Sequence, residues 1–141
     1  MITLTHETLD PRRVEDAVIW PGAGAVLTFS GVARDHFDGR TVVKLEYQAY
    51  REMALTEMAR IRDEAVERWP GIRVALAHRT GPVAIREASV IISVAAPHRD
   101  EAYQASRFLI DTLKARVPIW KKEIYQDGSS WKENQEASSD S

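Results

Sequence analysis

Cysteine is absent from the 141 residues of this sequence. Its absence excludes disulfide bonds, metal sites built from thiolates and a thiol nucleophile, so any sulfur chemistry must use sulfur that another molecule carries. The four histidines are scattered along the chain, and no two of them have the i, i+4 spacing that a helical zinc site favours. We therefore expect neither a metal site nor a bound cofactor.

Long apolar runs and a strong net charge are also missing. No run approaches the roughly 20 apolar residues that span a membrane, and the first residues lack the basic-then-apolar pattern of a signal peptide. The net charge of −2 argues against a general nucleic-acid binder, because such proteins are usually basic as a whole. With 44% hydrophobic and 28% charged residues, the composition is typical of one soluble globular domain, which we expect in the cytoplasm.

Apolar periodicity predicts an α+β fold. The expected helices are residues 11–18, 51–69 and about 98–117, and the expected strands are residues 2–5, 25–33, 42–49, 73–80, 89–96 and 119–125, with a short extended piece at 83–85. Helices that alternate with hairpin-like strand pairs favour a mixed, mostly antiparallel sheet. We expect residues 1–132 to form one domain, followed by a polar tail, residues 133–141, whose composition is typical of disorder.

Some residues carry finer expectations. Asp10 precedes a proline and is suited to cap the first helix. Gly31 lies inside an expected strand, which suggests a bulge or a close approach of the backbone. In the next strand, alternation places Val43, Leu45 and Tyr47 on one face, and we interpret Tyr47 as a core or interface aromatic rather than a catalyst.

A basic segment surrounds Pro118, which must end a helix; its cations are Lys114, Arg116, Lys121 and Lys122. Lys114 and Arg116 fall in the last helical turn, where cations also have the ordinary role of offsetting the helix dipole. Lys121 and Lys122 follow on a strand, so they point to opposite faces. A lysine in a partly desolvated pocket can act as an acid, a base or a nucleophile, because its pKa falls readily there. Both the structural and the functional interpretation remain open at this point.

A second basic pair, His98 and Arg99, stands at the expected start of the last helix. A helix N-terminus presents free N–H groups to anions and the arginine fork suits phosphate, although a solvated pair at a helix start is about as plausible. Arg34 occupies a loop, shaped by Gly31 and Gly39, where an arginine is usually a surface charge. Spacing and composition thus predict an α+β domain with a localised site for a small phosphorylated or otherwise anionic ligand.

Several short segments between about residues 24 and 131 are recognisable sequence motifs. They are Phe-Ser-Gly-Val-Ala-Arg at 29–34, Leu-Glu-Tyr-Gln-Ala-Tyr at 45–50 with Met-Ala at 53–54, His-Arg-Thr-Gly at 78–81, Pro-His-Arg at 97–99, Asp-Thr-Leu-Lys at 111–114 and Pro-Ile-Trp-Lys-Lys-Glu at 118–123. Together they resemble the family of molybdopterin synthase catalytic (large) subunits. The resemblance implies an α/β-hammerhead fold and a homodimer of large subunits, which forms a heterotetramer with a small subunit at each end.

The same resemblance implies a sulfurtransferase of molybdenum cofactor biosynthesis. Such enzymes convert cyclic pyranopterin monophosphate into molybdopterin by installing two dithiolene sulfurs. The sulfur comes from a small ubiquitin-like partner that carries a thiocarboxylate on its C-terminal Gly-Gly. This agrees with the lack of cysteine, because the donor sulfur sits on the partner.

The residues that the resemblance implies at the site are catalytic Lys114 and Lys121, and substrate-binding Arg34, His98, Arg99, Lys122 and Glu123. Lys114 would sit beside the thiocarboxylate, and Lys121 would assist proton transfer or hold the pterin. In the family the pocket is built across the dimer, so His98 and Arg99 would serve the neighbouring subunit's site. Arg86 stands where many members have glycine, which would reshape a turn away from the chemistry.

Two alternatives stay beside this interpretation. The chain could be a hydrolase or transferase that acts on another phosphorylated heterocycle through the same basic pocket and without a partner protein. It could also be a non-catalytic module, in which the lysines only neutralise an anionic ligand. Dependence on a thiocarboxylated partner and a separate chemical defect in lysine variants distinguish these cases.

Overall fold

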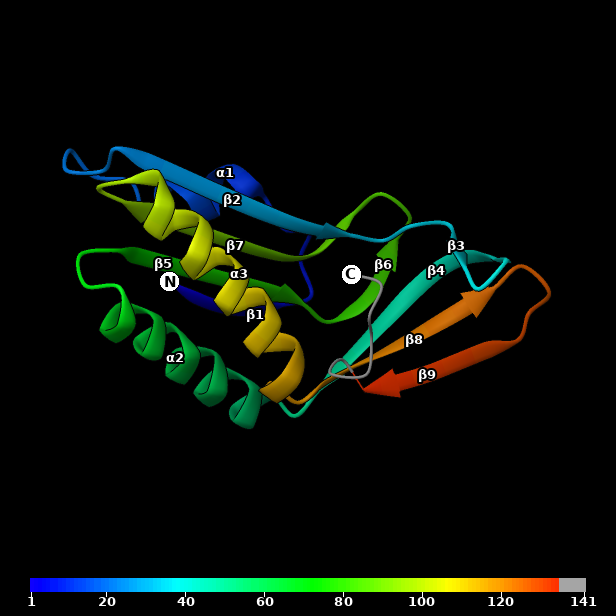
Figure 1. Ribbon diagram of the computed structural model, residues 1–141. Coiled ribbons are helices and arrows are strands. Elements are labelled where there is room, and N and C mark those ends of the chain that lie inside the picture. The colour runs from blue at the N-terminus through cyan, green and yellow to red at the C-terminus, as the bar shows by residue number, and fades with distance from the viewer. Residues whose placement is uncertain (135–141) are drawn as a thin grey trace.

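Two β-sheets and three helices make up residues 1–134, the part of the chain that the computed structural model describes (Figure 1). In chain order the elements are β1 (Ile2–Thr5), α1 (Pro11–Asp16), β2 (Ala25–Val32), β3 (His36–Phe37), β4 (Arg40–Ala49), α2 (Arg51–Arg68), β5 (Arg73–Arg79), β6 (Gly81–Ala84), β7 (Ala88–Ala96), α3 (Arg99–Arg116), β8 (Ile119–Tyr125) and β9 (Ser130–Asn134). The predicted α+β class is confirmed, and each predicted helix is present. Asp10 caps α1 as expected, accepting a hydrogen bond from the backbone N–H of Arg12. Within residues 1–134 no helix is long and apolar enough to cross a membrane.

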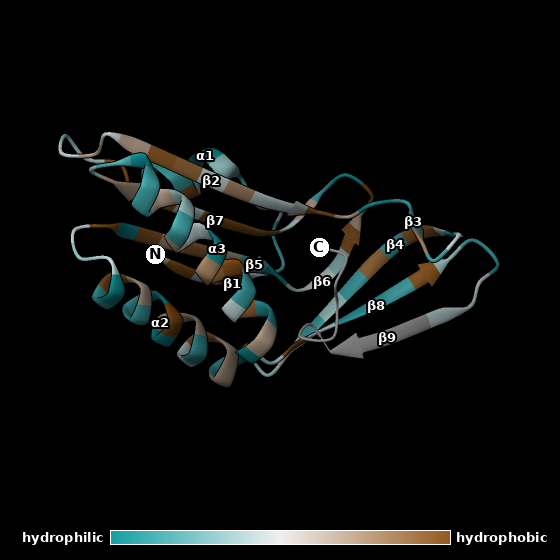
Figure 2. Cartoon of the chain, in the orientation of Figure 1, coloured by the Kyte–Doolittle hydropathy of each residue, from teal (hydrophilic) through white to brown (hydrophobic). Residues whose placement is uncertain are grey.

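The first sheet has the strand order β1-β5-β7-β2 and lies between two helical layers. α2 and α3 cover one face, where Met58 and Leu109 are fully buried. On the other face, α1 and the residues after it place Val14 and Val18 against β5 and β7. With both faces covered, β5 and β7 are largely apolar, as the brown colour of β7 in Figure 2 shows. This sheet therefore provides most of the core and supports α3.

The second sheet has the order β3-β4-β8-β9, with β6 also paired to β4. It contains two strands that the sequence did not predict, β3 and β9. β3 closes onto β4 through a two-residue turn in which Asp38 and Gly39 have φ of 52° and 76°, so the expected polar loop 34–40 is a tight hairpin. β9 extends to Asn134, past the expected domain boundary at 132, and residues 135–141 of the expected tail lie outside the described residues.

Two bulges modify the pairing. The predicted bulge in β2 is confirmed: the register shifts after Gly31, and a Cβ there would lie 2.7 Å from Cγ1 of Val90. A second shift, between Val42 and Lys44, was not predicted. Because of it Val42 is buried and Val43 is 47% exposed, so the expectation that Val43 faces the core was wrong.

The chain passes from the first sheet to the second at Gly81. The sequence pattern treats Gly81 as the end of a strand, but it begins β6, with a φ of 81° that other residues rarely adopt. β6 pairs with β4, and Gly81 lies opposite Tyr47. The corner therefore brings His78, near the end of β5, against the second sheet.

Candidate functional site

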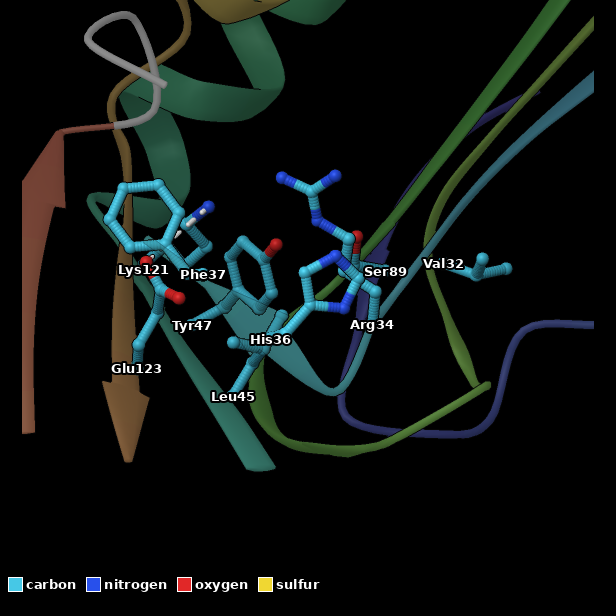
Figure 3. Close-up of a pocket in the computed structure, with 9 residues that line it drawn as sticks. All are labelled: Val32, Arg34, His36, Phe37, Leu45, Tyr47, Ser89, Lys121 and Glu123. Atoms are coloured by element: carbon cyan, nitrogen blue, oxygen red, sulfur yellow. Dashed lines mark ion pairs between the residues drawn. The ribbon is translucent and has the colours of Figure 1, made fainter. Parts of the chain in front are cut away.

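A small cavity lies between the second sheet and the segment that joins β2 to β3 (Figure 3). Its lining residues are Val32, Arg34, His36, Phe37, Leu45, Tyr47, Ser89, Lys121 and Glu123. The structure thus brings together Arg34, Lys121 and Glu123, which were expected to act in one site. They come from two segments that are far apart in the sequence.

The register between β4 and β8 decides which side chains face this cavity. Tyr47 lies opposite Lys121, and Leu45 lies opposite Glu123. Since side chains alternate along a strand and paired residues share a face, these four point to the same side of the sheet. Lys122 points to the opposite face and does not line the cavity, so its role in substrate binding remains a prediction.

The cavity has a buried, charged floor on β8, whereas Arg34 at its edge is exposed. Lys121 and Glu123 are only 6% and 3% exposed, and Nζ of Lys121 lies 3.9 Å from Oε1 of Glu123. The guanidinium of Arg34 adds a second cation, so the two cations outnumber the single carboxylate. The free space of about 30 Å³ accommodates one or two waters, which suits a carboxylate-sized anionic group better than a whole ring system.

Lys114 lies in a neighbouring groove. It is 9% exposed, in the last turn of α3, and the groove runs between α3 and β2. Phe29 lines the groove and Val32 lines the cavity, and these two residues are about 10 Å apart along β2. The two lysines expected to be catalytic therefore approach the same end of β2 from different sides.

His98 and Arg99 lie at the other end of α3. His98 is the N-cap residue and makes no side-chain cap hydrogen bond, and both side chains are exposed. Arg99 is 15 residues before Lys114, which corresponds to about 22 Å along the helix. Within one chain these two residues do not join the cavity.

The turn at Arg86 lies closer to the site than expected. Arg86 has a φ of 80°, a left-handed conformation that favours glycine. Its backbone N–H donates to the carbonyl of Ala33 at 2.7 Å, and the N–H of Ala33 donates to the carbonyl of Glu87 at 2.9 Å. Because Ala33 precedes Arg34, this turn anchors the segment that carries Arg34 and lies next to the candidate cavity.

Tyr47, which was expected to be a core or interface aromatic, belongs to the core and also lines the cavity. It is 4% exposed, and its ring meets that of His78 edge to face, with centroids 5.1 Å apart and planes at 70°. His78 is completely buried, and its Nδ1 lies 2.8 Å from the carbonyl of Arg79, so Nδ1 donates. Burial lowers the pKa of His78 to about 4, which keeps the ring neutral at neutral pH. Its Nε2 has no hydrogen-bond partner in the described part of the chain.

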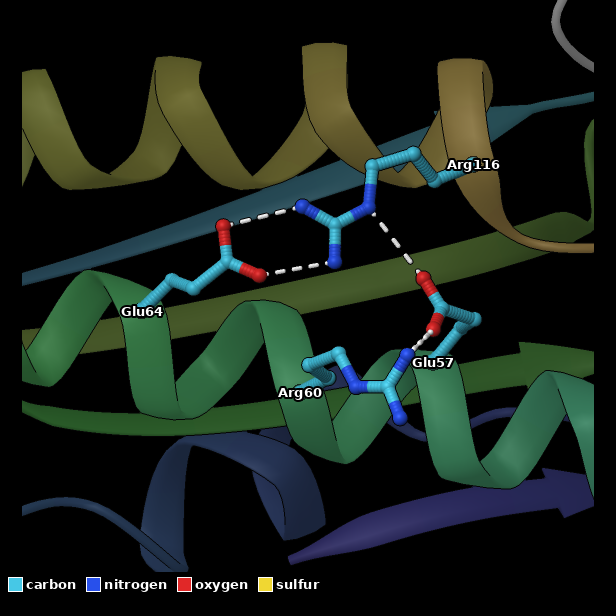
Figure 4. Close-up of polar contacts among 4 residues, drawn as sticks. All are labelled: Glu57, Arg60, Glu64 and Arg116. Carbon is cyan, nitrogen blue, oxygen red and sulfur yellow. Dashed lines mark hydrogen bonds and ion pairs between the residues drawn. The ribbon is translucent and has the colours of Figure 1, made fainter.

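Arg116, the remaining cation of the basic segment, ties α3 to α2 (Figure 4). Its guanidinium donates to both carboxylate oxygens of Glu64, at 2.9 and 2.7 Å, and to Glu57 at 3.2 Å. Glu57 also accepts from Arg60 at 2.6 Å. The hydrogen bonds from Arg116 lower the pKa of Glu64. Arg116 therefore has a structural role, which is to hold α3 against α2.

Comparisons with known proteins agree on one family. The sequence profile of the MoaE protein family matches residues 4–116. The chain is 50% identical over 136 residues to a protein of Taeniopygia guttata named molybdopterin synthase catalytic subunit, a match that covers 96% of this chain and 88% of the relative.

Solved structures give the same result. A molybdopterin synthase structure from Staphylococcus aureus has a TM-score of 0.89 and 38% identity, covering 92% of this chain and 94% of that one. A chain from Helicobacter pylori, described as part of a complex of subunits 1 and 2 of molybdopterin-converting factor, shares the fold with a TM-score of 0.73 at 21% identity, covering 89% and 86%.

Proposed function

Since the chain belongs to the MoaE protein family, enzymes of molybdenum cofactor biosynthesis, we propose that it converts cyclic pyranopterin monophosphate into molybdopterin by sulfur transfer. The sulfur donor is the C-terminal Gly-Gly thiocarboxylate of a small ubiquitin-like partner subunit. One observation carries the proposal: the cavity lined by buried Lys121 and Glu123 and by exposed Arg34 is cationic and has room for a carboxylate-sized anion.

The two lysines assist hydrolysis of the thioester at the acyl carbon of the partner's tail in different ways. Starting from the thioester that joins the partner's acyl carbon to a sulfur on the pterin, water adds to the acyl carbon, the acyl carbon–sulfur bond breaks, and its electron pair stays on the pterin sulfur. The products are a carboxylate on the partner, a thiol on the pterin and one proton, so atoms and charge balance. Lys114, beside the acyl group, stabilises the oxyanion that forms when water adds, and Lys121 transfers protons or holds the pterin.

Arg34, His98 and Arg99 hold the substrate's phosphate, with Lys122 as a further contact. Because His98 and Arg99 are about 22 Å from Lys114 in one chain, they serve the site of a second copy. A two-fold axis that sets the two α3 helices antiparallel brings the N-terminus of one helix to the C-terminus of the other. The active assembly is thus a homodimer of this chain with a small subunit on each protomer.

Mixing two inactive variants tests this shared site. One carries Lys114→Ala with Lys121→Ala, and the other carries His98→Ala with Arg99→Ala. Random exchange makes half the dimers mixed, and each mixed dimer has one intact site, so about a quarter of the wild-type activity should return. If all these residues act within one chain, mixing restores nothing.

Reconstitution tests the function itself. The purified chain is combined with cyclic pyranopterin monophosphate and a thiocarboxylated small subunit, and the dithiolene product is measured. Product that requires all three components is the expected result. Turnover of a phosphorylated heterocycle without the partner would support the partner-independent enzyme instead. If Lys114→Ala weakens binding and causes no separate loss of turnover, the non-catalytic module is the better interpretation.

A further inference from the structure

We propose that Tyr47 is a catalytic residue of this site, whose hydroxyl donates a hydrogen bond to the acyl oxygen of the thiocarboxylate while water adds to the acyl carbon. The inference rests on the proposed sulfur transfer and adds a participant to it. Figure 3 shows the ring of Tyr47 extending into the cavity, with its hydroxyl on the side of Arg34 and Lys121.

The position of Tyr47 is fixed from two sides. Tyr47 is paired with Lys121 of β8 on one side of β4 and with Gly81 of β6 on the other side. Behind the ring stands His78, which is completely buried and meets the ring edge to face at 5.1 Å. The backbone hydrogen bond at Nδ1 fixes the orientation of the imidazole. A tyrosine held in this way has little freedom to move its hydroxyl when a ligand enters.

The proposed reaction requires a hydrogen-bond donor next to the acyl oxygen. Negative charge moves onto the acyl oxygen when water adds, and a preorganised donor in a water-poor cavity stabilises such charge strongly. A phenol offers this donor without adding a third cation beside Lys121 and Arg34. His78 is neutral at neutral pH, so the support behind the ring adds no charge to the site either.

Tyr47→Phe removes the hydroxyl and keeps the ring on His78. We expect kcat to fall about 100-fold with little change in KM, the loss typical of one oxyanion donor. Tyr125→Phe is the matched control: Tyr125 is also 4% exposed and on the same sheet, but it does not line the cavity. It should keep wild-type kcat. Thermal unfolding of both variants verifies that they are folded.

His78→Gln tests the support behind the ring. If His78 acts by positioning Tyr47, this variant lowers kcat in the wild-type background and causes little further loss in the Tyr47→Phe background. Equal kcat for Tyr47→Phe and Tyr125→Phe, with an active wild type, would overturn the role of Tyr47 alone. A wild type that makes no product with the partner present would overturn the sulfur transfer and this role with it.

Discussion

Replacing His78 by glutamine should make the protein less sensitive to acid. The ring is completely buried, and burial lowers its pKa from 6.5 to about 4. Between these two values the unfolded chain binds a proton that the folded chain does not bind. The free energy of unfolding therefore falls as the pH drops from 6.5 to 4, and this contribution is constant above and below that window.

The magnitude follows from the two pKa values. The full difference between 6.5 and about 4 corresponds to about 3 kcal/mol, of which about 2.5 kcal/mol is already lost at pH 4.5. For a domain whose total stability is about 5–15 kcal/mol, this is a large part. The His78→Gln variant lacks the titrating group. Between pH 7.5 and 4.5 it should therefore lose about 2.5 kcal/mol less stability than the wild type.

Urea unfolding followed by tryptophan fluorescence measures the effect, since the chain has four tryptophans. Curves are taken at fixed protein concentration between pH 7.5 and 4.5. His98→Gln is the matched control, because its ring is exposed in the folded chain, and it should follow the wild type. If wild type and His78→Gln lose the same stability to within about 0.5 kcal/mol, the reasoning about burial is refuted.

Three further changes test other features of the structure. Arg86→Gly relieves a φ of 80° and should raise stability by about 1 kcal/mol, seen as a higher Tm; an unchanged Tm would contradict the strain. Gly31→Ala places a Cβ 2.7 Å from Cγ1 of Val90 and should lower stability by about 1–3 kcal/mol. If this clash is the cause, adding Val90→Ala should restore part of the stability that Gly31→Ala loses. No recovery in the double variant would contradict the clash. Arg116→Met should lower Tm at low salt and less so in 1 M NaCl, because the bonds to Glu64 and Glu57 are partly exposed ion pairs; a salt-independent loss would indicate packing instead.

Helices and most strands could be predicted because their signals are local. Asp10 and the proline after it open α1, and Pro118 ends the basic segment's helix regardless of the rest of the fold. β3 has only two residues, too few to show a period, and the bulge after Val42 shifts a face without any mark in the sequence. Such features depend on the partner strand, which periodicity does not identify.

The sequence by itself determined the types of the elements, the family resemblance and the choice of Lys114, Lys121, Arg34 and Glu123 as candidates. Only the tertiary structure decided which of them meet. The register of β4 against β8 turned Tyr47 toward Lys121, and the length of α3 separated His98 from Lys114. The physical reason is that helix and turn signals act over a few neighbouring residues, whereas a site is formed by pairing and packing between segments that are distant in the chain.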